Sequence, residues 1–69
     1  MLLSIVVPVY NEEENIANFY KAVTDVMSGL TYDYELIFVD DGSSDSSAMI
    51  LREIAYNDKH VKVLLLARN

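Results

Sequence analysis

The fold is decided by the segment S-I-V-V-P-V-Y-N-E, Ser4 to Glu12, and by a second segment, F-V-D-D-G-S-S-D, Phe38 to Asp45. In each segment an apolar run typical of a buried strand changes into polar and acidic residues typical of a turn and a helix start. Ligands of an open parallel sheet bind at the edge where its strands give way to helices. The two segments therefore predict one half of a nucleotide-binding site.

Working outward, the run from Leu3 to Val9 is rich in β-branched residues and predicts a buried parallel strand, with Pro8 near its end. Asn11 then offers a helix N-cap, and Glu14, three residues on, completes a pair like a capping box. The acidic residues between them complement the helix dipole. The helix is expected to stop near Gly29. Its apolar stripe is formed by Ile16, Phe19, Tyr20, Val23, Met27 and Leu30.

A second strand is predicted from about Tyr34 to Val39, followed by a turn that Ser43 or Ser44 caps. The next helix begins at Asp45, and Val61 to Leu66 forms a third strand. The apolar positions of that helix include Met49, Leu51, Ile54 and Ala55. Right-handed crossovers place the three strands parallel, with both helices on one face. The predicted fold class is α/β: a three-layer-type, Rossmann-like β-α-β-α-β half with an incomplete parallel sheet of three strands.

Composition narrows the classes of function. The chain has 69 residues, 52% of them hydrophobic, which is generous for so short a chain and indicates a piece of something larger. Its net charge is −6, with eleven acidic residues against five Lys and Arg, so no basic face is available for nucleic acid. Cysteine is absent, which excludes disulfides and thiolate chemistry. The apolar runs are far shorter than a membrane span, and we expect a cytoplasmic location.

Asp40 and Asp41 carry the strongest chemical prediction. A carboxylate at the end of a strand can accept the N–H of a nucleotide base while the adjoining backbone fixes its plane. Such residues suit a base or a ribose better than a phosphate. The alternative is that both aspartates only start a turn before Gly42, with Ser43 and Asp45 capping the following helix; capping and binding can coexist.

Tyr10 favours a similar role for the first segment, because an aromatic ring just beyond a buried strand can stack on a base or sugar. Pro8 stiffens the backbone just before Tyr10; the alternative is that it only ends the strand. The acidic stretch from Asn11 to Glu14 is also what good helix design alone would give.

Other candidates are weaker. The sequence Asp33-Tyr34-Glu35 has the spacing of a metal-diphosphate clamp, but it starts a strand at the side opposite the expected site, so a solvated loop is favoured. His60 lacks a partner at catalytic or zinc spacing and is assigned a loop or strand-edge role. Arg68 and Asn69 would reach the binding edge if the protein continues. The tyrosines Tyr20, Tyr32, Tyr34 and Tyr56 are expected to cover the rim of the core.

Three segments together resemble the N-terminus of a family 2 glycosyltransferase with the GT-A fold. They are S-I-V-V-P-V-Y-N-E-E-E-N-I, Y-E-L-I-F-V-D-D-G-S-S-D-S-S and V-K-V-L-L-L-A-R-N, and they span essentially the whole chain. The branch they are most similar to acts on polyprenyl phosphates and includes dolichol-phosphate mannose synthases and bactoprenol glucosyltransferases. The resemblance implies that Pro8, Tyr10, Glu12, Asp40 and Asp41 hold the nucleotide of a nucleotide-diphospho-sugar donor. It leaves open which aspartate meets the base.

The resemblance further implies that residues 1–69 are the N-terminal, nucleotide-sugar-binding portion of a GT-A domain. The parent would be an inverting glycosyltransferase that transfers a hexose, to a polyprenyl phosphate or a saccharide, at the cytoplasmic face of a membrane. A divalent cation, Mg²⁺ or Mn²⁺, would neutralise the departing nucleoside diphosphate. The D-x-D metal ligands and the catalytic base of the family would follow residue 69. We therefore expect no catalytic or metal-ligating residue in this chain, and no activity of the chain alone.

Alternative functions make different predictions for this sequence. A non-catalytic nucleotide-binding or self-associating α/β module would show affinity without turnover. A receiver-type signalling domain is disfavoured, because its phosphorylated aspartate would follow the third strand, where this chain has Ala67 and Arg68. A dinucleotide-binding half is excluded, because no G-x-G-x-x-G follows the first strand. The uncharged edge from Ile5 to Val7 predicts self-association through that edge or through the uncovered sheet face.

Overall fold

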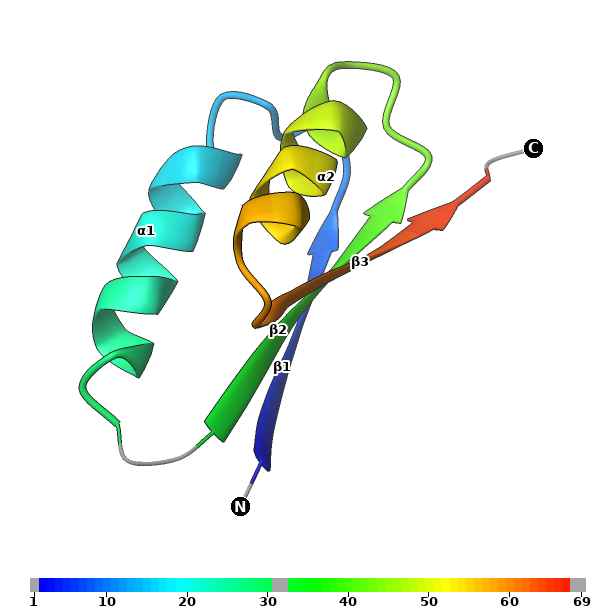
Figure 1. Cartoon of the computed structure of the whole chain (residues 1–69). Coiled ribbons are helices and arrows are strands. Elements are labelled where there is room, and N and C mark those ends of the chain that lie inside the picture. Colours follow the sequence, from blue (N-terminus) through cyan, green and yellow to red (C-terminus); the bar gives the residue numbers. More distant parts are fainter. Residues whose placement is uncertain (1, 31–32, 68–69) are drawn as a thin grey trace.

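The computed structural model describes residues 2–30 and 33–67 as an open sheet with two helices (Figure 1). The elements alternate along the chain as the sequence predicts, so the α/β fold class is confirmed. They are β1 (Leu2–Val9), α1 (Ile16–Met27), β2 (Asp33–Asp41), α2 (Ser47–Asn57) and β3 (Val61–Leu66).

All three strands are parallel and lie in the order β1-β2-β3. The register pairs Val9 of β1 with Asp40 of β2, and Asp40 in turn with Leu65 of β3. The carboxyl ends of the strands therefore reach one common edge. This edge carries both segments that the sequence singles out.

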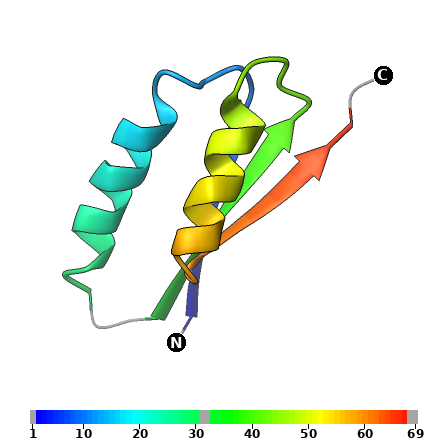
Figure 2. The ribbon, with the colours of Figure 1, turned by 45° about the horizontal axis from the view of Figure 1, so that its top comes forward.

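The core lies between the sheet and the two helices, which pack on the same sheet face (Figure 2). Leu36 and Phe38 of β2 and Leu51 of α2 are each no more than 1% exposed. The ring of Phe19 meets that of Phe38 edge-on, with centroids 6.3 Å apart. Fully burying one such side chain stabilises the fold by about 1.5–3 kcal/mol. These contacts set the height of the helices above the sheet.

The opposite sheet face is not covered by any helix of the described residues. Val6 and Leu64 are 62% and 52% exposed on it. At the amino end of the strands this face carries a polar row: Glu35 accepts a hydrogen bond from the Ser4 hydroxyl at 2.6 Å and pairs with Lys62 at 3.2 Å. The apolar part of this face therefore lies toward the carboxyl ends of the strands.

A second polar cluster lies at the amino ends of β2 and β3, next to the turn between α2 and β3. The Tyr20 hydroxyl of α1 donates to Asp58 at 2.5 Å, and the His60 backbone N–H donates to the same carboxylate at 2.9 Å. The His60 ring stacks on Tyr34 with centroids 4.4 Å apart. His60 thus has the strand-edge role that the sequence predicts, and Asp58 links α1 to the turn before β3.

The structure corrects several local predictions. Helix α2 begins at Ser47 after the N-cap Ser46, so Asp45 does not begin it and neither Ser43 nor Ser44 caps it. Helix α1 begins at Ile16 after the N-cap Asn15, so Asn11 does not cap it. Met49, expected on the apolar side of α2, is 66% exposed, and Tyr56, expected at the core rim, is 90% exposed. Both point away from the sheet because Leu51 occupies the inward position of that helix. The predictions for Tyr32, Arg68 and Asn69 concern positions outside the described residues.

No helix within residues 2–30 and 33–67 combines the length and the apolar character that crossing a membrane requires.

Candidate functional site

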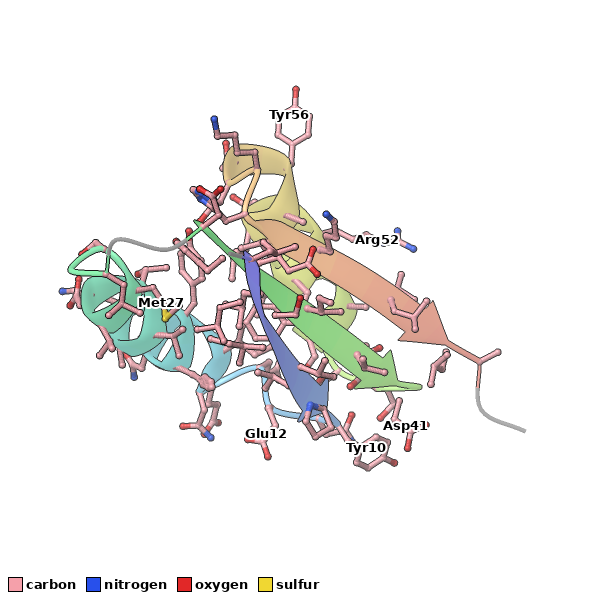
Figure 3. The ribbon with its side chains drawn as sticks, turned by 90° about the horizontal axis from the view of Figure 1, so that it is seen from below. Tyr10, Glu12, Met27, Asp41, Arg52 and Tyr56 are labelled. Atoms are coloured by element: carbon pink, nitrogen blue, oxygen red, sulfur yellow. The ribbon has the colours of Figure 1, made fainter. Side chains whose placement is uncertain are left out.

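The predicted site residues gather at the carboxyl ends of β1 and β2. Tyr10 and Glu12 follow β1, and Asp41 is the last residue of β2 (Figure 3). Pro8, still within β1, pairs with Val39, and its exposed ring belongs to the uncovered face of the sheet. Pro8, Tyr10, Glu12 and Asp41 are exposed at or next to this edge, whereas the Asp40 side chain is buried.

The two aspartates have different environments. Asp40 is 3% exposed and accepts a hydrogen bond from the Ser43 backbone N–H at 3.3 Å and another from the Ser43 hydroxyl. Between them Gly42 adopts a φ of 75°, a left-handed conformation that favours glycine. Asp40 thus closes the turn after β2. Asp41, which faces the other side of the strand, is exposed.

Tyr10, which directly follows β1, and Asp41, which ends β2, occupy equivalent places at the strand ends. The register pairs the preceding residues, Val9 and Asp40, so Tyr10 and Asp41 are the next residues along the two neighbouring segments. Tyr10 is 45% exposed and lies at the same strand-end edge as Asp41 in Figure 3. An accessible aromatic ring and an accessible carboxylate are thereby brought to one edge. Together they can offer a stacking surface and a hydrogen-bond acceptor.

Glu12 shapes the turn between β1 and α1. Its backbone carbonyl accepts the N–H groups of Asn15 and Ile16 at 2.9 and 3.2 Å, and its carboxylate accepts the Asn15 side-chain amide at 3.1 Å. Beside this turn, β1 and α1 enclose a hollow of about 170 Å³ whose lining includes Pro8, Glu12 and Phe38. The exposed carboxylate of Glu12 is therefore held near the same strand end.

Cross-loop hydrogen bonds join residues 11–13, after β1, to residues 43–47, after β2. They run in both directions, with backbone N–H groups of each loop donating to side chains of the other. The donor and acceptor pairs are Asn11 N–H to Ser43 Oγ (2.9 Å), Glu12 N–H to Ser47 Oγ (3.0 Å), Glu13 N–H to Asp45 Oδ2 (3.3 Å), Ser44 N–H to Asn11 Oδ1 (2.8 Å) and Ser46 N–H to Glu13 Oε2 (3.0 Å).

These bonds explain the acidic residues around the start of α2. Asp45 accepts the Ser47 backbone N–H at 2.9 Å, and the Glu13 carboxylate reaches the Ser46 N–H from the other loop. Both carboxylates lie near the start of α2, where the positive end of the helix dipole stabilises negative charge. Hydrogen bonding from the Ser47 side chain, with further backbone bonds, lowers the pKa of Asp45 against the opposing effect of burial.

The sequence prediction missed the role of Asn11 and Ser47. Asn11 has a φ of 49°, which asparagine tolerates better than most residues, and this turns its side chain toward Ser44 instead of toward α1. Ser47 is fully buried at the first position of α2. Two signals in the sequence point to these roles: an asparagine lies just beyond the end of one strand, and a dense run of serines follows the next strand.

No group of three acidic, histidine or cysteine side chains within the described part of the chain is arranged to hold a metal ion. The carboxylates of Asp40, Glu13 and Asp45 accept hydrogen bonds from protein groups instead. Asp33 and Glu35, at the amino end of β2, lie at the edge opposite the site. The described residues therefore do not fit a bound cation.

The chain is similar in sequence to proteins of one known family. The sequence model of the family described as "Glycosyl transferase family 2" matches residues 4–69. The "Undecaprenyl-phosphate 4-deoxy-4-formamido-L-arabinose transferase" of Proteus mirabilis (strain HI4320) is 47% identical over 68 residues, 97% of this chain and 21% of the relative. The "Uncharacterized glycosyltransferase YkcC" of Bacillus subtilis (strain 168) is 50% identical over 66 residues, 96% of this chain and 20% of the relative.

A third relative, the "Prophage bactoprenol glucosyl transferase homolog" of Escherichia coli (strain K12), is 42% identical over 69 residues, 100% of this chain and 22% of the relative. The chain thus spans about a fifth of the length of the curated relatives it matches. The family match covers both strand-end segments and, except for the first two residues of β1, all five elements of the fold. On this match, the chain belongs to glycosyl transferase family 2.

Proposed function

We propose that the carboxyl ends of β1 and β2 bind the nucleotide of a nucleotide-diphospho-sugar donor. The observation that carries this proposal is the placement of two accessible side chains of suitable chemistry just beyond the paired residues Val9 and Asp40: Tyr10 directly follows β1, and Asp41 ends β2. Glu12 and Pro8 complete the proposed site beside them.

In this proposal Asp41 meets the base, and Asp40 holds the turn that presents it. The imide N–H of uracil, or the N–H groups at the edge of guanine, are donors that an exposed carboxylate accepts well. The ring of Tyr10 would stack on the base or the ribose. The buried carboxylate of Asp40 is already engaged by Ser43, which is why it is assigned the supporting role.

The chain would be the donor-binding part of an inverting glycosyltransferase that moves a hexose to a polyprenyl phosphate. Two of the relatives described above carry names of transferases that act on undecaprenyl phosphate or bactoprenol, which supports this acceptor. An acceptor oxygen would attack the anomeric carbon while the nucleoside diphosphate departs. The lipid chain of such an acceptor would keep the parent enzyme at the cytoplasmic face of a membrane.

A divalent cation would neutralise the departing diphosphate, and its ligands are proposed to lie outside the described residues. The chain alone would then bind nucleotide without transferring sugar. A transfer assay with UDP-glucose or GDP-mannose and a polyprenyl phosphate is expected to give no product with this chain alone.

The isolated chain is also proposed to self-associate. β1 pairs only with β2 among the described strands, and beside its free edge a hollow of about 390 Å³ is lined by apolar side chains of β1 and α1, including Ile5, Phe19 and Val26. The uncovered sheet face is the other candidate surface, with Val6 and Leu64 exposed. Unpaired edges and large apolar patches both favour association.

A nuclear magnetic resonance titration of the chain with UDP and GDP tests where on the chain a nucleotide binds. Amide resonances of residues 10–12 and 41–43 are expected to shift with added nucleotide. Those of residues 33–35, at the opposite end of β2, serve as the internal control and are expected to stay in place. Shifts confined to residues 33–35, or none in a folded chain, would contradict the proposed site.

A further inference from the structure

The hydrogen bonds across the site single out two residues that do not belong to the proposed ligand contacts. Asn11 and Ser47 stand at the two ends of the cross-loop hydrogen bonds, on either side of the strand ends. Each bonds to the backbone of the opposite loop over more than thirty residues of sequence, since the separations are 33 and 35. Such bonds fix the loops relative to each other and not merely within themselves.

Asn11 is specialised for this contact by its backbone. Its φ of 49° turns the chain away from β1, and its side-chain oxygen accepts the Ser44 N–H at 2.8 Å. Its own N–H donates to the Ser43 hydroxyl at 2.9 Å. Because that hydroxyl donates onward to Asp40, a continuous chain of hydrogen bonds runs from the β1 loop to the last buried residue of β2.

Ser47 makes the corresponding contact from the second loop. It is 0% exposed, and its hydroxyl accepts the Glu12 N–H at 3.0 Å. A buried hydroxyl that bonds a backbone amide of another segment leaves that amide unsatisfied when it is removed. Ser47 therefore sets where Glu12, and with it the turn after Tyr10, lies against the start of α2.

We propose that Asn11 and Ser47 are positioning residues, which hold the loop of Tyr10 and Glu12 at a fixed separation from Asp41. This inference rests on the proposed nucleotide site, because it assigns these residues a role in affinity. The physical reason is preorganisation: a site whose loops are already ordered loses less conformational entropy when the ligand binds. Neither residue needs to touch the nucleotide for its loss to weaken binding.

Two variants test this, with two measurements on each. In Ser47→Ala the Glu12 amide is expected to exchange its hydrogen at least about tenfold faster, and in Asn11→Ala the Ser44 amide is expected to do so. Both variants are also expected to weaken binding of UDP or GDP, whichever the unmodified chain binds, by about tenfold. Asn11→Asp keeps an acceptor oxygen at the same place and is expected to restore slow exchange at Ser44.

The matched control is Ser28→Ala. Its hydroxyl donates to the Asp25 carbonyl at 3.0 Å after the end of α1, away from both loops, so neither exchange nor affinity is expected to change. Asn11 is exposed, so its variants test the contact without opening the core.

The outcomes separate this inference from the proposed function. A folded, unmodified chain that binds neither UDP nor GDP contradicts the nucleotide proposal and with it the role in affinity. If the chain binds nucleotide and either affinity or amide exchange is unchanged in both variants, positioning by Asn11 and Ser47 is overturned while the nucleotide site stands. Faster exchange together with weaker binding, and rescue by Asn11→Asp, supports both.

Discussion

The carboxylate of Asp40 accepts both the backbone N–H and the hydroxyl of Ser43, which closes the turn at the end of β2. The next residue, Asp41, points to the other side of the strand and is exposed. Two identical side chains, adjacent in sequence, are thereby separated into a structural acceptor and an accessible one. The proposed assignment of the nucleotide base to Asp41 depends on this separation.

Removing the two carboxylates is predicted to affect stability very differently. Asp40→Ala leaves the Ser43 donors without their acceptor at a buried position, and the free energy of unfolding is expected to fall by about 1–3 kcal/mol. Asp41→Ala changes an exposed side chain and is expected to alter it by less than about 0.5 kcal/mol. Urea unfolding followed by circular dichroism measures both. Equal losses in the two variants would refute the division of roles.

The contact between Tyr20 and Asp58 predicts a loss of stability at high pH. The hydrogen bond that Tyr20 donates to Asp58, together with burial and the nearby negative charge, raises the pKa of Tyr20 to about 12. The unfolded value is about 10, so the contribution is complete below pH ~10 and is lost as the pH rises toward 12. Urea unfolding of the unmodified chain should therefore show the free energy of unfolding falling over this pH range. In Tyr20→Phe the fall should be smaller.

The same contact between Tyr20 and Asp58 predicts a loss of stability at low pH. Burial alone would raise the pKa of Asp58, but hydrogen bonds from Tyr20 and His60 and the charge of His60 outweigh it, so the pKa lies below its usual range. This part of the stability is present above pH ~4 and is lost as the pH falls through the lowered value. Tyr56→Phe, at a tyrosine that is 90% exposed, is the control and should follow the unmodified chain at both low and high pH. A Tyr20→Phe profile identical to that control would show that the contact contributes nothing.

Self-association is predicted for the isolated chain, and two lysine substitutions locate the surface. Val26→Lys places a charge beside the free edge of β1, and Leu64→Lys places one on the uncovered sheet face. Light scattering is expected to show oligomers of the unmodified chain and a lower mass for whichever variant disrupts the contact. Met49→Lys, on the exposed side of α2, is the control. A monodisperse monomer at high concentration of the unmodified chain would contradict the prediction.

The sheet was predictable from sequence because its signals are local. The third strand has the predicted bounds, Val61–Leu66, since Asn57-Asp58-Lys59 ends the preceding helix and an unbroken apolar run follows. The first strand differs from its prediction by one residue. The resemblance identified the family from short segments at strand ends, and the match over residues 4–69 confirmed it.

The interior of the site was not predictable in the same way. Asn11 has the features of a helix cap, but its partner Ser44 lies 33 residues further along the chain, and no local pattern encodes that contact. The difference in burial between Asp40 and Asp41 was not predictable from the sequence either. β2 is apolar on both faces, with Leu36 and Phe38 toward the helices and Ile37 and Val39 opposite, so alternation alone does not reveal which aspartate turns inward.

Calorimetric titration of the chain with UDP and GDP, each with Mg²⁺ or Mn²⁺, shows whether Asp41 contributes to a nucleotide site. It is best done on the unmodified chain, on Asp41→Asn and on Asp33→Asn, which neutralises an exposed aspartate at the opposite end of β2. We expect binding of one nucleotide, a loss of at least about tenfold in affinity in Asp41→Asn, and no change of affinity in Asp33→Asn. Equal affinity in all three chains, or no binding by a chain that circular dichroism shows to be folded, would contradict this expectation.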